Sequence, residues 1–293
     1  MAPLQLLIVE GNSAERNGQI RAQGGRVYAD VYAAVLKAIA PAAEFCVAQP
    51  SETDPPDLLR QIDLEGLDGV VWTGSSLNAY DGGVAVRRQI DLFGELYDAR
   101  LPIFGSCWGL QVMAVARGGV VRRNPRGREI GIARDIELTP AGTAHPMFQG
   151  KLAKFDSITT HVDEVERLPS GAVALAGNAA SAIQAAVLED DGRSFWGVQY
   201  HPEFDFEVLA QVLRRASRDL VAEGMFSSPD ALERVCRSLL EVDAGSGQGD
   251  LARSTLGVSD GVADPAVRRL EIKNWIDQVN TRRRAPGSAP TPG

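Results

Sequence analysis

The sequence predicts an α/β protein with a doubly wound, mostly parallel sheet, antiparallel additions to that sheet, and a C-terminal helical extension. Three observations lead to this class. Over residues 4–118, short apolar runs alternate with stretches of helical length, which is typical of parallel strands buried on both faces. Residues 120–200 hold several short strand candidates separated by turns, as antiparallel strands do. After about residue 226, only helical patterns remain.

The N-terminal part supplies the predicted parallel strands and their crossover helices. The first strand covers residues 4–9 and closes at Glu10, and a polar stretch containing glycines follows to about Gly25. Further strands are predicted at 44–48, 68–74 and 101–105, and helices at 27–40, 84–99 and 110–117. Gly118 is a suitable C-terminal end for the last helix. This alternation favours a sheet covered by helices on both faces.

The middle of the chain supplies the predicted antiparallel additions. Short strand candidates lie at 130–133, 136–138, 172–176 and 183–188. Another apolar strand begins at Phe195 and runs into a polar turn near His201, and a helix is expected over 205–223.

The chain is expected to divide into a main domain over 1–225, a helical extension over 226–285 and a disordered tail over 286–293. A helix is predicted from about Ser228 to Val242, a flexible linker near 243–263, and a last helix starting at Asp264-Pro265. The last helix carries an apolar face with helical spacing, formed by Ile272, Trp275, Ile276 and Val279. This face either packs on the chain's own main domain or docks a partner or second copy, which would give a homo-oligomer through the C-terminal helices.

Composition excludes several classes of protein. The formal net charge is −8 and the pI is about 5.1, which argues against nucleic-acid binding because phosphate binding needs clustered Lys and Arg. The start lacks the features of a signal peptide, and no window approaches the ~20 apolar residues that span a bilayer. Three scattered cysteines without a CxxC pair indicate neither a disulfide framework nor a metal site. We expect a cytoplasmic protein with no membrane or nucleic-acid partner.

The first chemical motif is a cysteine at a predicted strand-to-helix turn. Cys107 follows a short buried strand and precedes a helix, with Gly105, Ser106 and Gly109 around it. Such a tight turn exposes a nucleophile at the edge of the sheet, and small residues relieve its crowding. The helix N-terminus favours a thiolate and offers backbone N–H groups to a developing oxyanion. The alternative is a buried cysteine acting as a small apolar residue.

The second motif places a histidine and a carboxylate at the end of another strand. His201 is one of three histidines, and Glu203 follows two residues later. A cysteine nucleophile needs a base, and the base needs a group that fixes its tautomer. A His-x-Glu at a strand end is ordinary alone, but joined to the cysteine motif it indicates a catalytic triad.

Together these motifs resemble the class I (triad) glutamine amidotransferases. The resemblance rests on Gly-Ser-Cys-Trp-Gly-Leu-Gln at 105–111 and Tyr-His-Pro-Glu at 200–203, and it extends over about 4–223. It is greatest to the amidotransferase part of GMP synthase and its stand-alone relatives. Residues 160–165, Thr-His-Val-Asp-Glu-Val, are similar to the family's Ser-His-Gly-Asp-type loop. The family's fold implies a flavodoxin-like sheet.

The resemblance implies a role for each matching residue. Cys107 would attack the glutamine carboxamide to form a γ-glutamyl thioester, His201 would move protons, and Glu203 would orient His201. The expected oxyanion hole comprises Trp108 and the turn with Gly74 and Ser75. The expected substrate-binding residues are Gln111, His161 and Asp163.

Three positions depart from the family pattern. The family's Gly-Gly-Pro-type oxyanion turn is replaced by Gly74-Ser75-Ser76, a bulky Trp108 follows the nucleophile, and Val162 stands where the loop motif has glycine. These changes affect the expected oxyanion and substrate contacts, but they leave the three triad residues in place.

Several other residues are predicted to be structural. His145 is expected in a turn outside the site, and Cys46 and Cys236 in the core. Tyr80 and Trp196 are interpreted as packing residues.

Two enzyme functions follow from the triad. The first is hydrolysis of glutamine to glutamate and ammonia, with the ammonia passed to a partner synthetase subunit, because the sequence contains no nucleotide phosphate loop of its own. The second is a stand-alone hydrolase of γ-glutamyl peptides or amides. A non-catalytic regulatory subunit is the third alternative, which the intact triad disfavours. No metal or organic cofactor is expected.

Overall fold

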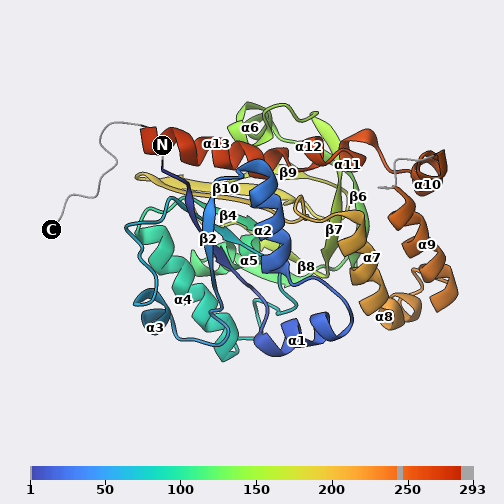
Figure 1. Ribbon diagram of the computed structural model, residues 1–293, viewed down its shortest axis with the longest axis horizontal. Helices are drawn as coiled ribbons and strands as arrows, with labels where there is room; N and C mark the ends of the chain where they lie inside the picture. Colours follow the sequence, from blue (N-terminus) through green and yellow to red (C-terminus); the bar gives the residue numbers. More distant parts are fainter. Residues whose placement is uncertain (1, 243–246, 285–293) are drawn as a thin grey trace.

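The computed structural model describes residues 2–242 and 247–284, and within them nine strands form one sheet in the order β2-β1-β3-β4-β11-β10-β9-β6-β7 (Figure 1). Two further strands, β5 and β8, pair antiparallel beside it. The strands are β1 Gln5–Val9, β2 Glu44–Ala48, β3 Gly69–Trp72, β4 Ile103–Ser106, β5 Val120–Arg123, β6 Glu129–Leu138, β7 Lys154–His161, β8 Asp163–Arg167, β9 Ala172–Gly177, β10 Ala185–Asp190 and β11 Arg193–Val198.

The sheet confirms the predicted mixture of parallel and antiparallel strands. β2, β1, β3, β4 and β11 run parallel, in the strand order typical of flavodoxin-like folds. β10, β9, β6 and β7 extend the sheet antiparallel to one another. Because β4 and β11 are parallel neighbours, their carboxyl ends lie together at one edge.

Helices cover both faces of the sheet, as predicted. Apolar residues of α2 and α13 pack with Phe104 and Trp196 on one face, and those of α4 and α5 pack with Trp72 and Phe195 on the other. The helices are α1 Ala14–Ala22, α2 Tyr28–Ile39, α3 Pro55–Leu59, α4 Val84–Asp98, α5 Trp108–Ala116, α6 Pro140–Ala144, α7 Phe206–Arg215, α8 Ser217–Ala222, α9 Pro229–Val242, α10 Gly247–Leu256, α11 Asp260–Ala263, α12 Pro265–Arg268 and α13 Leu270–Arg284, with a 3₁₀ turn at Pro146–Phe148. No described helix has the length and apolar character needed to cross a membrane.

The C-terminal helices pack onto the main domain. Leu232, Cys236 and Leu239 of α9 share an apolar cluster with α7, and Val262 of α11 joins it. The apolar face of α13 is buried in the core beneath the parallel sheet, with exposures of 0–2%. The chain itself therefore covers that face. The face is not free to form the homo-oligomer that the sequence allowed as an alternative.

The region near 243–263 differs from the predicted flexible linker. α10 and α11 lie within it, and Ala252 and Val258 are buried against the α7–α9 cluster. Burial of these apolar residues outweighs the low helix propensity of the local glycines. Residues 243–246 and the predicted tail over 286–293 lie outside the described residues.

Three local predictions are wrong for identifiable reasons. The polar stretch before Gly25 contains α1, which Ser13 caps by accepting a hydrogen bond from the Arg16 N–H. The strands predicted at 130–133 and 136–138 form one strand, β6, because a bulge with a positive φ at Asp135 joins them. The segment 160–165 is no loop, but the end of β7 and the start of β8.

Candidate active site

Cys107 lies at the turn between β4 and α5, in a backbone conformation that side chains rarely adopt. Its φ is 50° and its ψ is −94°, and its N–H donates to the Val198 carbonyl of β11 at 2.7 Å. A Cβ on Gly105 would meet the backbone of Gly109 at 2.9 Å, so the turn requires a glycine at that position. Strain held at one residue by its surroundings is typical of a nucleophile elbow.

His201 and Glu203 form a buried pair at the end of β11, beside the cysteine turn. The His201 Nδ1 and Glu203 Oε1 atoms are 2.7 Å apart, and the two side chains are 1% and 0% exposed. The Phe204 ring stacks on the imidazole with centroids 4.0 Å apart. The buried Nε2 atom of His201 has no hydrogen-bond partner among the described residues, which leaves it available to a reacting group in the pocket.

The environment of His201 favours its charged form. Burial opposes protonation, but the Glu203 carboxylate and the Cys107 side chain together raise the pKa of His201 to about 10. Ser106 donates a hydrogen bond to Glu203 Oε1 at 2.9 Å, and its hydroxyl is 2.8 Å from that of Tyr32. The Oε1 atom of Glu203 thus contacts both Ser106 and His201, which helps to fix the orientation of the imidazole.

A pocket of about 340 Å³ opens over Cys107. Of the residues predicted to form the site, Ser75, Cys107, Gln111, His161, Asp163 and His201 line this pocket. The other three predicted residues do not line the pocket. Glu203 lies behind His201, Gly74 is buried against His201, and Trp108 is buried in the core. Gln199 donates to the Cys107 sulfur at 3.4 Å, and that sulfur is 3.7 Å from the Thr160 carbonyl.

The predicted oxyanion turn packs directly against His201. A Cβ on Gly74 would lie 2.8 Å from His201 Cε1, so glycine is required here for space. The N–H of Ser76 donates to Asn12 Oδ1, whereas those of Gly74 and Ser75 donate to no described residue. The bulky indole of Trp108 is buried in the core, where its Nε1–H donates to Gln89 at 2.7 Å.

Gln111 and Asp163 stand together at one end of the pocket. The Gln111 amide is 3.5 Å from both the Asp163 carbonyl and Gln199 Oε1. Burial raises the pKa of the Asp163 carboxyl, and Tyr80 opposes that effect by donating a hydrogen bond to it at 3.0 Å. Tyr80, interpreted from the sequence as a packing residue, is 48% exposed and contacts a pocket residue instead.

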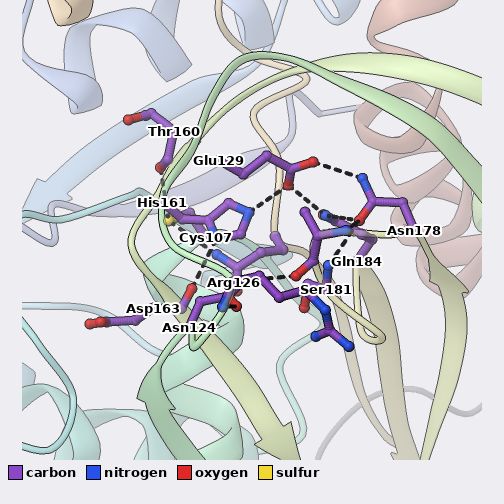
Figure 2. A network of polar contacts seen from close by, with 12 residues as sticks. Cys107, Asn124, Arg126, Glu129, Thr160, His161, Asp163, Asn178, Ser181 and Gln184 are labelled. Atoms are coloured by element: carbon purple, nitrogen blue, oxygen red, sulfur yellow. Dashed lines mark hydrogen bonds and ion pairs between the residues drawn. The ribbon is translucent and has the colours of Figure 1, made fainter. Parts of the chain in front are cut away.

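His161 is held by the protein through both ring nitrogens. Its Nε2 atom is 2.8 Å from Glu129 Oε2, and its Nδ1 atom is 2.9 Å from the Asp163 carbonyl. Figure 2 shows Glu129 also receiving hydrogen bonds from Asn178 and Gln184, each at 2.7 Å. Both ring nitrogens of His161 are therefore occupied by protein groups, and neither is free for the predicted substrate binding. The network instead fixes the segment that lines the pocket.

Other structural predictions have mixed outcomes. His145 lies outside the pocket and makes a T-shaped contact with Trp196, with ring centroids 4.8 Å apart. Cys236 is buried as expected. Cys46 is exposed on β2, an edge strand, so its predicted core position is wrong. In the described part of the chain, no group of three or more His, Cys, Asp or Glu residues is arranged to hold a metal ion.

A cysteine at a strand-to-helix turn, beside a His–Glu pair that follows the adjacent parallel strand β11, is the arrangement of an enzyme that uses a thiol nucleophile. The family model for "Glutamine amidotransferase class-I" matches residues 28–216. The chain belongs to this family of enzymes.

Particular relatives differ in how much of their length the chain covers. It is 32% identical to a γ-glutamyl-L-1-hydroxyisopropylamide hydrolase from a Pseudomonas species, over 95% of this chain and 94% of that protein. It is 27% identical to the GMP synthase of Thiobacillus denitrificans, over 84% of this chain but 45% of the synthase. A glutamine amidotransferase structure from Thermotoga maritima has the same fold, with a TM-score of 0.61 at 16% identity over 94% of this chain and 97% of that one.

Proposed function

We propose that this enzyme hydrolyses γ-glutamyl amides through a thioester on Cys107, with glutamine as the smallest substrate of the class. The observation that carries the proposal is the His201–Glu203 pair, 2.7 Å apart and buried beside the cysteine turn, with the Nε2 atom of His201 unpartnered among the described residues. A base already oriented by its carboxylate is the main requirement for thiol catalysis.

The reaction consists of two balanced steps. In the first, Cys107 reacts as the thiolate while His201 holds its proton: Sγ bonds to the amide carbon, and the carbon–nitrogen bond breaks as His201 gives that proton to the departing amine. In the second, His201 takes a proton from water as the water oxygen bonds to the carbonyl carbon, and the thioester breaks to release glutamate. The sum is one amide and one water converted into glutamate and an amine.

Backbone N–H groups are proposed to stabilise the oxyanion in both steps. The first N–H groups of α5, beginning at Trp108, lack acceptors within the helix. Those of Gly74 and Ser75 donate to no described residue, and Ser75 lines the pocket. Fixed donors of this kind commonly provide a large share of the rate enhancement in acyl transfer.

Two observations favour amides larger than glutamine. Besides His201, the same pocket is lined by Val212, Arg215 and Ala216 at the end of α7, and its volume of about 340 Å³ gives room for a substituent on the departing nitrogen. The chain also aligns over nearly the full length of a protein named as a hydrolase of a substituted γ-glutamyl amide.

The second candidate is glutamine hydrolysis that supplies ammonia to a synthetase subunit. It is supported by 29% identity to a glutamine-hydrolysing GMP synthase subunit of Methanoculleus marisnigri, over 56% of this chain and 77% of that protein. Under this alternative, glutamine would be turned over better than any substituted amide.

The test measures glutamate release from glutamine and from γ-glutamylethylamide by the purified chain. We expect turnover of both, with the ethylamide preferred, and loss of both in Cys107→Ala. Cys236→Ala is the matched control, because that buried thiol lies outside the pocket. Glutamate release that survives Cys107→Ala would refute the thioester mechanism, and preference for glutamine would favour ammonia supply.

A further inference from the structure

The two ends of the pocket differ in chemistry. Among its lining residues, Gln111 lies beside Asp163, and Tyr28 lies near Arg215; we assign these two pairs to opposite ends. The Tyr28 ring is 6.4 Å from the ring of His201, the residue that gives its proton to the departing amine under the proposed function. Tyr28 and Arg215, with Val212 and Ala216, therefore border the space that a substituent on the departing nitrogen would fill. We call these four residues the amine end.

Arg215 brings a positive charge to the amine end without a carboxylate to neutralise it. Among the described residues, no Asp or Glu oxygen lies within 4.0 Å of its guanidinium. The adjacent Arg214 is paired with Glu233 at 2.7 Å, and Arg128, also in the pocket wall, is paired with Glu223 at 3.0 Å. The pocket-facing arginine of α7 thus has no acidic partner in the described chain, whereas its neighbour has one.

The position of Arg215 is fixed by its surroundings. Burial raises the pKa of the Tyr28 hydroxyl, and the charge of the nearby Arg215 guanidinium opposes that effect. A Cβ on Gly25 would lie 2.7 Å from the Arg215 Nη1 atom, so glycine leaves the space that this atom occupies. Tyr28 in turn packs on Phe204 with ring centroids 5.2 Å apart. A guanidinium held in place is suited to bidentate binding of a carboxylate.

The remaining charges near this end leave it positive. Arg16 of α1 also lines the pocket and has no carboxylate within 4.0 Å among the described residues. Two acidic groups oppose this charge. Asp219 of α8 is exposed to solvent, which weakens its effect, and burial raises the pKa of Glu10, which acts on Tyr28, and so favours its neutral form. Val212 and Ala216 are small and apolar, which suits a compact substituent.

We propose that the amine end is a carboxylate-binding subsite and that the preferred substrates are γ-glutamyl amino acids. Arg215 holds the carboxylate of the departing amino acid while His201 protonates its nitrogen. The reaction then converts a γ-glutamyl amino acid and water into glutamate and the free amino acid. This inference rests on the proposed function, because it names the leaving group of the same reaction.

Three substrates of similar size isolate the carboxylate. They are γ-glutamylethylamide, γ-glutamylethanolamide and γ-glutamylglycine, whose amine substituents end in a methyl, a hydroxyl and a carboxylate. We expect kcat/KM to be highest for γ-glutamylglycine. Arg215→Gln should lower the ratio of kcat/KM for γ-glutamylglycine to kcat/KM for γ-glutamylethylamide by about 10- to 100-fold, the usual effect of removing a charged hydrogen-bond partner. Arg215→Lys should restore part of the ratio. Arg218→Gln, at an exposed position of α8 outside the pocket, should leave it unchanged.

The outcomes separate this inference from the proposed function. If the ethylamide is cleaved but γ-glutamylglycine is not preferred, the subsite is wrong and the hydrolase remains. A hydroxyl substituent that equals the carboxylate also overturns the subsite, since a guanidinium charge would then give no advantage. Cleavage of none of the three, with Cys107 still open to alkylation by a glutamine analogue, overturns the proposed function and the subsite with it. The wild-type comparison alone decides the matter if Arg215→Gln does not fold.

Discussion

The Nε2 atom of His161 and the Oε2 atom of Glu129 lie 2.8 Å apart, and His161 lines the same pocket as Cys107. Although burial opposes ionisation, hydrogen bonds from His161, Asn178 and Gln184 lower the pKa of Glu129 below its ordinary value. The pair joins β6 to the end of β7, whose Thr160 carbonyl faces the Cys107 sulfur at 3.7 Å. Glu129 thus sets the position of a pocket wall that it does not itself form.

Replacing Glu129 with Gln should weaken substrate binding more than it slows the chemical step. The change removes the charge that holds His161, and so loosens residues 160–163 while leaving His201 and Glu203 in place. We expect KM to rise by about tenfold and kcat to change less. Steady-state kinetics with γ-glutamylethylamide measure both values, and Glu137→Gln, at an exposed position of the same strand, is the control. A fall in kcat at constant KM would contradict a positioning role.

The site was predictable from the sequence only where its residues are contiguous. Cys107 and the pair His201 and Glu203 stand in short motifs whose spacing carries the chemistry. Glu129 and Arg215 do not, because only the packing of the fold brings Glu129 against the pocket residue His161 and places Arg215 in the pocket wall. A glutamate at the start of a strand and an arginine at the end of a helix have the same sequence context as solvated charges.

A Gly74→Ala variant should lose activity. The added Cβ would lie 2.8 Å from His201 Cε1, so the imidazole must move away from its place beside Cys107. The backbone φ of Gly74 is not in the positive region, so alanine adds no backbone strain of its own and the effect comes from the displaced imidazole. We expect kcat/KM to fall about 100-fold or more, since misplacement of a base by about 1 Å has such effects.

Gly94→Ala is the matched control for Gly74→Ala. A Cβ there meets nothing within 4 Å, and the residue lies inside α4. This variant should keep full activity and gain about 0.5–1 kcal/mol in its free energy of unfolding. Full activity in Gly74→Ala would show that the turn and the imidazole are less tightly packed than the structure indicates.

The stabilising effect of the His201–Glu203 pair should depend on pH. The fold raises the pKa of His201 from its ordinary 6.5 to about 10, so the folded state holds this proton more tightly than the unfolded state. The resulting stabilisation is complete below about pH 6.5 and is lost as the pH rises towards 10. Glu203→Gln removes the carboxylate that raises this pKa. Urea unfolding should therefore show that the difference in the free energy of unfolding between wild type and variant shrinks from about pH 6.5 to about pH 9.5. A difference that grows over this range would contradict a raised pKa of His201 in the folded state.

The apolar face of α13 shows a second limit of sequence reasoning. The spacing of Ile272, Trp275 and Val279 predicts a buried helix face but cannot name what covers it. The chain's own sheet covers it, with the Phe104 and Trp275 ring centroids 6.1 Å apart. Likewise, α10 forms in a glycine-containing segment because it packs against apolar residues of α9. The local sequence of α10 does not show this contact.

Trp275→Ala should therefore destabilise the whole protein and not only its C-terminal helix. The indole is 1% exposed, and it packs so closely on β3 that a Cβ on Gly69 would lie 3.0 Å from its Cη2 atom. Truncating a large buried aromatic side chain costs about 3–5 kcal/mol, and we expect this loss in the free energy of unfolding measured with urea. Lys273→Ala removes an exposed ion pair with Asp277 on the same helix and should cost less than about 1 kcal/mol. Trp275→Phe should retain most of the stability, because the indole N–H has no hydrogen-bond partner among the described residues. If Trp275→Ala lost no more stability than Lys273→Ala, α13 would be an appendage rather than part of the core.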